Sequence, residues 1–192
     1  MVYSYQIDGL PVETGDIICT TDGNQRLLPG GVWRLFGALV PGPIDHVAVY
    51  VGPEGVCVES GPAGVVVFKV EDNTWDAQRM AGQRALLTDR LYGVAYPLAG
   101  RDLSPELEAT IRMDVAVYCL EQAAADRPYN LNFFNSHTER SFYCTQLVYQ
   151  AYLRSGIDLN TGRAALGRSE CDDIIFPQES WDACQHRQVV LV

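Results

Sequence analysis

Three β-branched segments separated by short turns place the strongest constraint on how this chain folds. The segments are residues 46–51 (HVAVYV), 56–60 (VCVES) and 65–70 (VVVFKV), and Gly and Pro residues punctuate the turns between them. Runs of this length and composition are typical of β-strands, and turns this short join antiparallel neighbours. The sequence therefore predicts an antiparallel meander over residues 46–70.

The turn Gly52-Pro53-Glu54-Gly55 predicts the register of the first two strands. If it forms a four-residue loop, Val51 lies opposite Val56. In that register His46 and Glu59 lie on the same face of the strand pair. The two residues are then diagonal neighbours with backbone positions roughly 7–8 Å apart, a span that a side-chain hydrogen bond can close. The opposite face of this strand pair carries only valine, so we expect that face to be the buried one.

Two helices are expected in the second half of the chain. The first begins with Ser104 as its cap and Pro105 at its first helical position, and we expect it to end near residues 127–128. The second begins at Ser141 and ends at Gly156, because glycine readily adopts the left-handed conformation that closes a helix. On the first helix, the residues that recur on one apolar face are Leu107, Ile111, Val115 and Tyr118.

The remaining segments complete an α+β pattern. Further strands are expected at residues 15–20, 84–88 and 188–192, residues 32–40 fit either a short helix or a packed loop, and residues 160–173 form a loop. Strands precede helices without βαβ alternation, which predicts a small antiparallel sheet or partial barrel packed against helices. A chain of 192 residues suits a single domain, residues 1–192.

Cys144, in SFYCTQLVYQAY, lies near the start of the second predicted helix. Unpaired N–H groups and the positive end of the helix dipole favour a thiolate there. Together with His46 and Glu59 it supplies the thiol, imidazole and carboxylate of a base-activated cysteine nucleophile. Asp45 is the alternative carboxylate and His137 the alternative base. Taken singly, each residue also fits a purely structural role, such as a buried inert thiol.

Four motifs in this order, GDII, DHVAVYVG, VCVES and SFYCTQLVYQAY, resemble the circularly permuted papain-like amidohydrolases of the NlpC superfamily. The resemblance covers most of residues 13–157. It implies that Cys144 is the nucleophile, His46 the general base and Glu59 the orienting acid. Tyr129, in RPYNLNFF, matches a tyrosine that contacts the oxyanion or the substrate. A permuted papain-like fold with neither metal nor organic cofactor is also implied.

The leading functional hypothesis is a cysteine hydrolase that cleaves an amide bond through a thioester intermediate. The amide would belong to a peptide, an isopeptide or an amidated small molecule. One alternative is a thioesterase or acyltransferase for lipid substrates, as some permuted relatives are, and another is a binding module without turnover. The aromatic residues around Cys144 fit either core packing or a substrate wall. The specific substrate and the oligomeric state stay open.

Charge and cysteine content narrow the partners and the compartment. A net charge of −10 opposes binding to nucleic acid and to anionic membranes. Six cysteines without a CxxC motif favour reduced thiols. The first residues show no signal peptide and no run reaches the roughly 20 apolar residues of a spanning helix, so we expect a soluble, cytoplasmic protein without stable membrane insertion. This expectation argues against a cell-wall substrate outside the membrane.

Metal and nucleotide chemistry find no support in the motifs. The one group rich in ligand-type residues lacks the close cysteine pairs of structural zinc sites. Its members are Cys171, Asp172, Asp173, Cys184 and His186. No phosphate-binding glycine loop is present, so we expect neither a metal nor a nucleotide cofactor.

Overall fold

The computed structural model describes residues 1–22, 42–161 and 174–190. Their centre is a six-stranded antiparallel sheet in the order β6-β5-β4-β3-β7-β8. The strands are β3 (Ile17–Thr21), β4 (His46–Tyr50), β5 (Val56–Gly61), β6 (Gly64–Lys69), β7 (Arg90–Tyr96) and β8 (His186–Val189). A separate hairpin joins β1 (Ser4–Ile7) to β2 (Leu10–Glu13). The sheet packs against helices, so the predicted α+β class is confirmed.

The predicted meander and its register are also confirmed. Strands β4, β5 and β6 follow one another as antiparallel neighbours, and Tyr50 pairs with Cys57. The Val51 N–H donates to the Val56 carbonyl at 2.9 Å, as the four-residue loop requires. Within the loop lies a short 3-10 turn, η1 (Pro53–Gly55), in which Gly55 has φ +86°. A side chain at this glycine would collide with the Val70 carbonyl oxygen, so the turn needs glycine.

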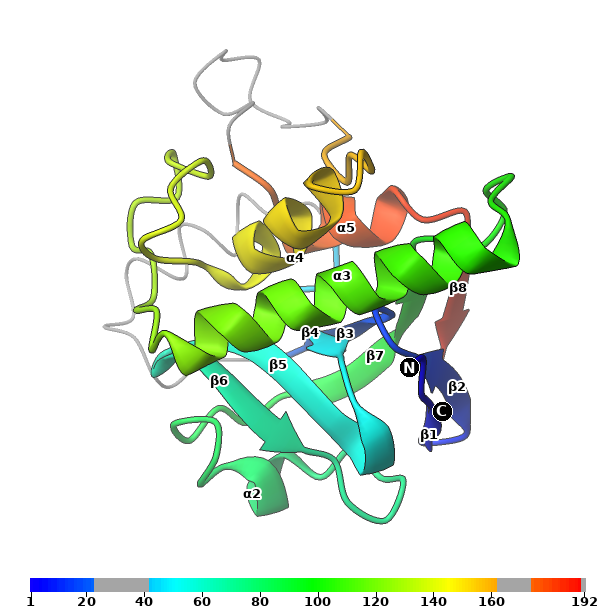
Figure 1. Ribbon diagram of the computed structural model, residues 1–192. Helices are drawn as coiled ribbons and strands as arrows, with labels where there is room; N and C mark the ends of the chain where they lie inside the picture. Colours follow the sequence, from blue (N-terminus) through cyan, green and yellow to red (C-terminus); the bar gives the residue numbers. More distant parts are fainter. Residues whose placement is uncertain (23–41, 162–173, 191–192) are drawn as a thin grey trace.

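One face of the sheet is covered by helices. Figure 1 shows α3 (Pro105–Ala124) running across the sheet, with α4 (Cys144–Leu153) and α5 (Pro177–Asp182) beside it. The valine face of β4 and β5 lies under these helices, with Val47, Val49 and Val58 in one apolar cluster with Ile111 and Leu147. Burying this face supplies the main apolar contact between sheet and helices.

The opposite face is buried as well, which corrects the expectation that only the valine face would be covered. Ala48, Tyr50 and Cys57 are fully buried and form a second apolar cluster with residues such as Phe68 and Trp75. The covering elements are the β1–β2 hairpin and the segment of residues 70–89, which contains α2 (Ala77–Met80). The alternation along β4 and β5 gave no sign of this second cover because these elements lie elsewhere in the sequence.

The predicted start of the first helix is confirmed. The Ser104 hydroxyl accepts the Leu107 N–H at 3.2 Å, and Pro105 is the first helical residue. The helix ends at Ala124, a little before the predicted end. Of its predicted apolar face, Ile111, Val115 and Tyr118 are buried, whereas Leu107, in the first turn, is exposed.

Two of the weaker strand predictions need correction. Residues 84–86 form turns, residues 87–88 have no regular secondary structure, and the strand begins only at Arg90, because Arg84 and Asp89 turn inward to a buried ion cluster. The predicted terminal strand is found as β8, which begins and ends earlier than residues 188–192. Residues 32–40 and most of residues 160–173 lie outside the described part of the chain.

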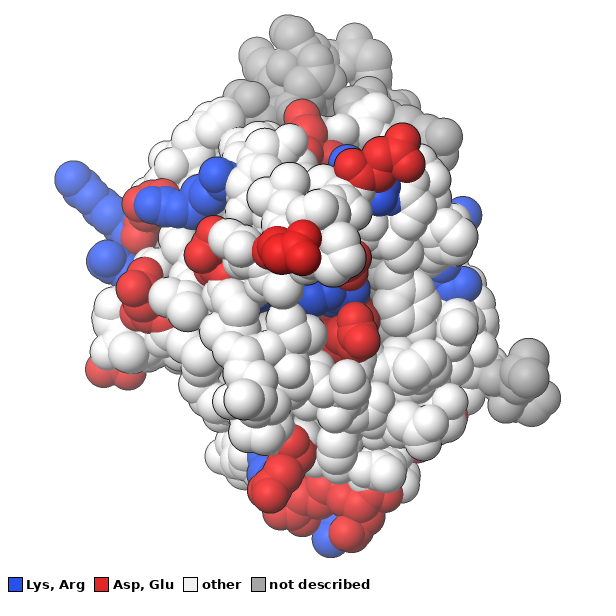
Figure 2. Space-filling view, turned by 45° about the vertical axis from the view of Figure 1, so that its right-hand side comes forward, with Lys and Arg blue, Asp and Glu red and all other residues white. Residues whose placement is uncertain are grey.

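The charged surface is mixed rather than strongly basic. On the face shown in Figure 2, Lys and Arg are interspersed with Asp and Glu, and acidic side chains gather at its lower end. None of the helices within the described ranges combines the length and apolarity that crossing a membrane requires.

Candidate active site

Helix α4 begins at Cys144 itself, which corrects the predicted start at Ser141. The residues before it are extended, because Phe142 forms a parallel bridge with Tyr129. In that bridge the Phe142 N–H donates to the Pro128 carbonyl at 3.0 Å, and its carbonyl accepts the Asn130 N–H at 2.9 Å. Cys144 is therefore the first helical residue, where backbone N–H groups have no acceptor within the helix.

Side-chain hydrogen bonds fix this helix start to the rest of the site. The Gln146 side-chain oxygen accepts the Tyr143 N–H at 3.2 Å and the Asn130 amide at 2.8 Å. The Ser60 hydroxyl, next to Glu59 in β5, donates to the Phe142 carbonyl at 2.6 Å. The strand that carries Glu59 and the turn that carries Cys144 are thus directly joined.

His46 and Glu59 form a buried hydrogen-bonded pair. The Nε2 atom of His46 lies 2.9 Å from Oε2 of Glu59, and both residues are almost completely buried. Because a carboxylate only accepts hydrogen bonds, we assign the proton to Nε2, which leaves Nδ1 for another partner. Glu59, and not the alternative Asp45, holds this edge of the ring.

The other neighbour of the His46 ring is Cys144. Burial alone would lower the pKa of His46, but the charge of Glu59 and the hydrogen bonds with Cys144 and Glu59 outweigh it and raise that pKa well above the usual range. The Cys144 thiol is thus a direct polar neighbour of the imidazole. The structure brings Cys144, His46 and Glu59 together in one line of contacts, with the ring in the middle.

Tyr129 also lies at this site. It is half-buried, its ring centroid is 6.3 Å from that of Phe133, and burial followed by the charge of Cys144 raises the pKa of its hydroxyl well above 10. The hydroxyl therefore keeps its proton at neutral pH and remains a hydrogen-bond donor. His137, the alternative base, is exposed on the loop that leads to α4.

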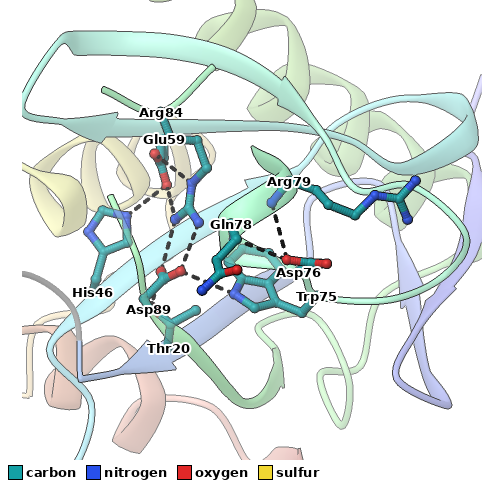
Figure 3. Close-up of polar contacts among 9 residues, drawn as sticks. All are labelled: Thr20, His46, Glu59, Trp75, Asp76, Gln78, Arg79, Arg84 and Asp89. Carbon is teal, nitrogen blue, oxygen red and sulfur yellow. Dashed lines mark hydrogen bonds and ion pairs between the residues drawn. The ribbon is translucent and has the colours of Figure 1, made fainter. Parts of the chain in front are cut away.

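Sequence reasoning missed Arg84, whose side chain is fully buried beside Glu59. Its Nε donates to Oε1 of Glu59 at 2.9 Å and its Nη2 to Oε2 at 2.7 Å, so the contact is bidentate. Figure 3 shows Glu59 held between His46 and Arg84. The guanidinium also lies 4.7 Å from the ring centre of Phe68 and 4.8 Å from that of Trp75.

Asp89 is the second carboxylate of this cluster. Arg84 donates to its two oxygens at 2.7 and 2.9 Å, and the Thr20 hydroxyl and Trp75 indole donate at 2.8 and 3.1 Å. Burial would raise the pKa of Glu59 and of Asp89, but Arg84 and the other donors lower both below their ordinary values. Both carboxylates are therefore charged, and every one of their oxygens accepts a hydrogen bond.

Little in the sequence could have identified Arg84. It lies 25 positions after Glu59 in a segment without clear periodicity, and it is one of 14 basic residues. The one available signal is physical: a buried carboxylate requires a cation or several donors, but the sequence predicted burial only for the opposite, valine face of the strand pair. That requirement does not say which basic residue supplies the charge.

The structure describes four cysteines besides Cys144. All four are free and buried, and burial raises the pKa of each thiol. They are Cys19, Cys57, Cys119 and Cys184. The prediction of unpaired thiols is confirmed for the described cysteines, and Cys171 lies outside them.

No metal site is evident in the part of the chain that the structure describes. Within those residues, no group of three His, Cys, Asp or Glu side chains is arranged to hold an ion. Cys171, Asp172 and Asp173, which belong to the ligand-rich group of the sequence, lie outside the described ranges.

A surface cleft borders the far end of the Arg84 cluster. It has a volume of about 480 Å³, and its lining includes Trp75, Asp76, Asp89 and Arg90. Neither Cys144 nor His46 lines this cleft, so it does not lead to the thiol.

Comparison of the chain with protein-family models, with curated proteins and with solved structures finds no match.

Proposed function

We propose that this protein is a cysteine hydrolase with a permuted papain-like fold, and that it cleaves an amide bond with Cys144 as nucleophile. One observation carries the proposal. The buried imidazole of His46 is hydrogen-bonded to the Cys144 thiol and to Glu59, whose carboxylate lies 2.9 Å from Nε2. A nucleophile, a base and a group that orients the base are the parts that covalent acyl transfer requires. The chain order supports the permuted arrangement, because β4 and β5 precede α4.

In the first half of the reaction, Nδ1 of His46 takes the thiol proton and the sulfur attacks the amide carbonyl carbon. The carbonyl oxygen becomes an oxyanion, which the Cys144 backbone N–H at the start of α4 can stabilise. Tyr129 is the proposed second donor, since its hydroxyl keeps its proton. Glu59 offsets the positive charge that the ring acquires.

In the second half, the tetrahedral intermediate collapses and the C–N bond breaks. The Nδ1 proton of His46 passes to the leaving amine, and the acyl group remains on Cys144 as a thioester. His46 then takes a proton from water and the resulting hydroxide attacks the thioester. The C–S bond breaks, the carboxylic acid is released, and the proton on His46 returns to the sulfur of Cys144. The proton balance closes without a cofactor.

The test is turnover of a panel of peptide amides, isopeptides, acyl anilides and fatty-acyl thioesters by wild type and Cys144→Ala. We expect hydrolysis of at least one amide by the wild type, a covalent acyl adduct at Cys144 in its mass spectrum, and complete loss of both in the variant. Glu59→Gln should lower kcat by roughly 100-fold, because it weakens orientation and charge balance but keeps the nucleophile.

The outcomes separate the alternatives. Hydrolysis of fatty-acyl thioesters without any amide cleavage would replace the amidase with a thioesterase. Amide turnover that survives in Cys144→Ala would refute the proposed nucleophile. If the wild type hydrolyses no compound of the panel and Cys144 remains unmodified, the result would favour a binding module without turnover.

A further inference from the structure

We infer that Arg84 is a positioning residue of this active site, which together with Asp89 holds Glu59 charged and fixed against the Nε2 edge of His46. The inference deepens the proposed hydrolase and rests on it for its catalytic meaning. Its structural basis is the set of contacts that link Asp89 to Arg84, Arg84 to Glu59 and Glu59 to His46 (Figure 3).

The first argument is geometric. Both oxygens of Glu59 accept N–H groups from Arg84, and Oε2 also faces His46. A single hydrogen bond would let the carboxylate rotate, whereas the planar guanidinium fork defines its plane. Rotation of Glu59 would break a charged hydrogen bond between side chains that have no exposed surface. The orientation of the imidazole is therefore set by Arg84 acting through Glu59.

The second argument concerns charge. The charged groups of the cluster are Arg84, Glu59 and Asp89, with Cys144 and Tyr129 near the other side of the His46 ring. When His46 is protonated, two cations and two carboxylates balance. Without Arg84, a buried carboxylate would take up a proton, and a neutral carboxyl group is a poor partner for an imidazolium ion.

The third argument is that Arg84 itself is fixed. Asp89 accepts two of its N–H groups, and Thr20 and Trp75 hold Asp89 in turn. The guanidinium also lies over the rings of Phe68 and Trp75. Such a network is what keeps a functional side chain in its productive geometry.

The competing reading is that Arg84 only neutralises buried carboxylates so that the protein can fold. Arg84→Lys separates the two, because it keeps the charge and removes the fork. Arg84→Met with Asp89→Asn separates them in a second way, since it removes one cation and one anion and leaves His46 and Glu59 balanced. The matched control is Arg112→Lys, the same substitution at another buried arginine whose partners lie elsewhere.

The experiment measures alkylation of Cys144 by iodoacetamide from pH 5 to 9, with peptide mapping, and the NMR titration of the His46 ring. In Arg84→Lys and in the double variant we expect alkylation at pH 7 to slow at least tenfold and the His46 titration to shift. In Arg112→Lys both should stay within twofold of wild type. A folded Arg84→Lys that matches Arg112→Lys in both readouts would overturn the inference, even if the double variant did not fold.

Neither readout needs a substrate, so the two proposals fail separately. If Arg84→Lys slows alkylation of Cys144 but the wild type hydrolyses no amide or thioester of the panel, the proposed hydrolase activity is refuted. The positioning role of Arg84 toward His46 then still stands. If Arg84→Lys hydrolyses and alkylates like wild type, only the positioning role is refuted.

Discussion

Two buried arginines, Arg84 and Arg112, bind carboxylates in different ways. The side chains of Arg84, Glu59 and Asp89 are all fully buried. Arg112, on α3, spreads its contacts over Asp16 at 2.8 Å, Glu108 at 2.8 Å and Glu13 at 3.3 Å. Of these only Asp16 is buried, and the other two reach water.

The difference appears in the carboxyl groups. Arg84 and His46 together outweigh burial and lower the pKa of Glu59, whereas burial dominates at Asp16 and raises its pKa to about 6 in spite of Arg112. Both oxygens of Glu59 accept N–H groups of one guanidinium, whereas Arg112 donates to only one oxygen of Asp16. Arg112 anchors α3 to the turn before β3, while the Arg84 cluster ends on the imidazole beside the candidate nucleophile.

The largest expected effect is on stability. Arg84→Met should lower the free energy of unfolding by about 3–5 kcal/mol, because it leaves two buried carboxylates without their cation. Arg112→Met should cost less, about 1–3 kcal/mol, since two of its three acidic partners are hydrated. Urea unfolding at pH 7 measures both, and equal losses would remove the distinction between the two clusters.

The next effect is a pH dependence of stability above pH 6.5 that the Arg84 cluster contributes through His46. Because the pKa of His46 is raised in the folded state, the folded protein binds this proton more tightly than the unfolded chain does. Its contribution to stability is complete below about pH 6.5 and is lost as pH rises through the folded pKa. The free energy of unfolding should therefore fall above pH 6.5, by at most about 1.4 kcal/mol per pH unit for one proton.

Unfolding measured from pH 7 to 8 in wild type, His46→Gln and Arg112→Lys checks this, because Asp16 titrates below this range and the buried thiols affect stability above it. We expect the fall in wild type and in Arg112→Lys, and its loss in His46→Gln. A curve of the same slope in His46→Gln would assign the effect to another group.

The smallest expected effect comes from the outer contact of the cluster. Thr20→Val removes the hydroxyl that donates to Asp89 and should cost about 1–2 kcal/mol, because a buried charged acceptor loses a donor. Thr110→Val is the control, since that exposed hydroxyl only bonds the Glu106 carbonyl in α3, and its cost should stay within about 0.5 kcal/mol. Matching losses in thermal or urea unfolding would mean that Thr20 contributes no more than a surface residue.

Local patterns predicted the parts of this molecule that depend on neighbours in sequence. The meander, the register that makes His46 and Glu59 neighbours, and the Ser104 cap of α3 all depend on short segments and are confirmed. The one-residue precision of the register matters, because a slip would move one of the pair to the opposite face of the sheet.

What the sequence could not predict depends on long-range contacts. Arg84 reaches Glu59 from a turn that looked like a strand, and the second cover of the sheet comes from the N-terminal hairpin and residues 70–89. The helix start at Cys144 is set by the bridge between Tyr129 and Phe142, 13 positions apart, and not by a local capping serine. In each case the residue or segment that determines the local structure is distant in the sequence, so the hydrophobic periodicity of the segment itself cannot predict it.

Burial of the second face of the sheet limits which nitrogen of His46 can exchange protons. Nε2 of His46 points into a cluster closed by Glu59 and Arg84, so a hydrogen on that nitrogen exchanges with water only when the cluster opens. The ring can gain or release a proton only at Nδ1, next to the sulfur. In the proposed reaction, a proton that His46 takes from Cys144 therefore leaves again from Nδ1, toward whatever is bound at the thiol.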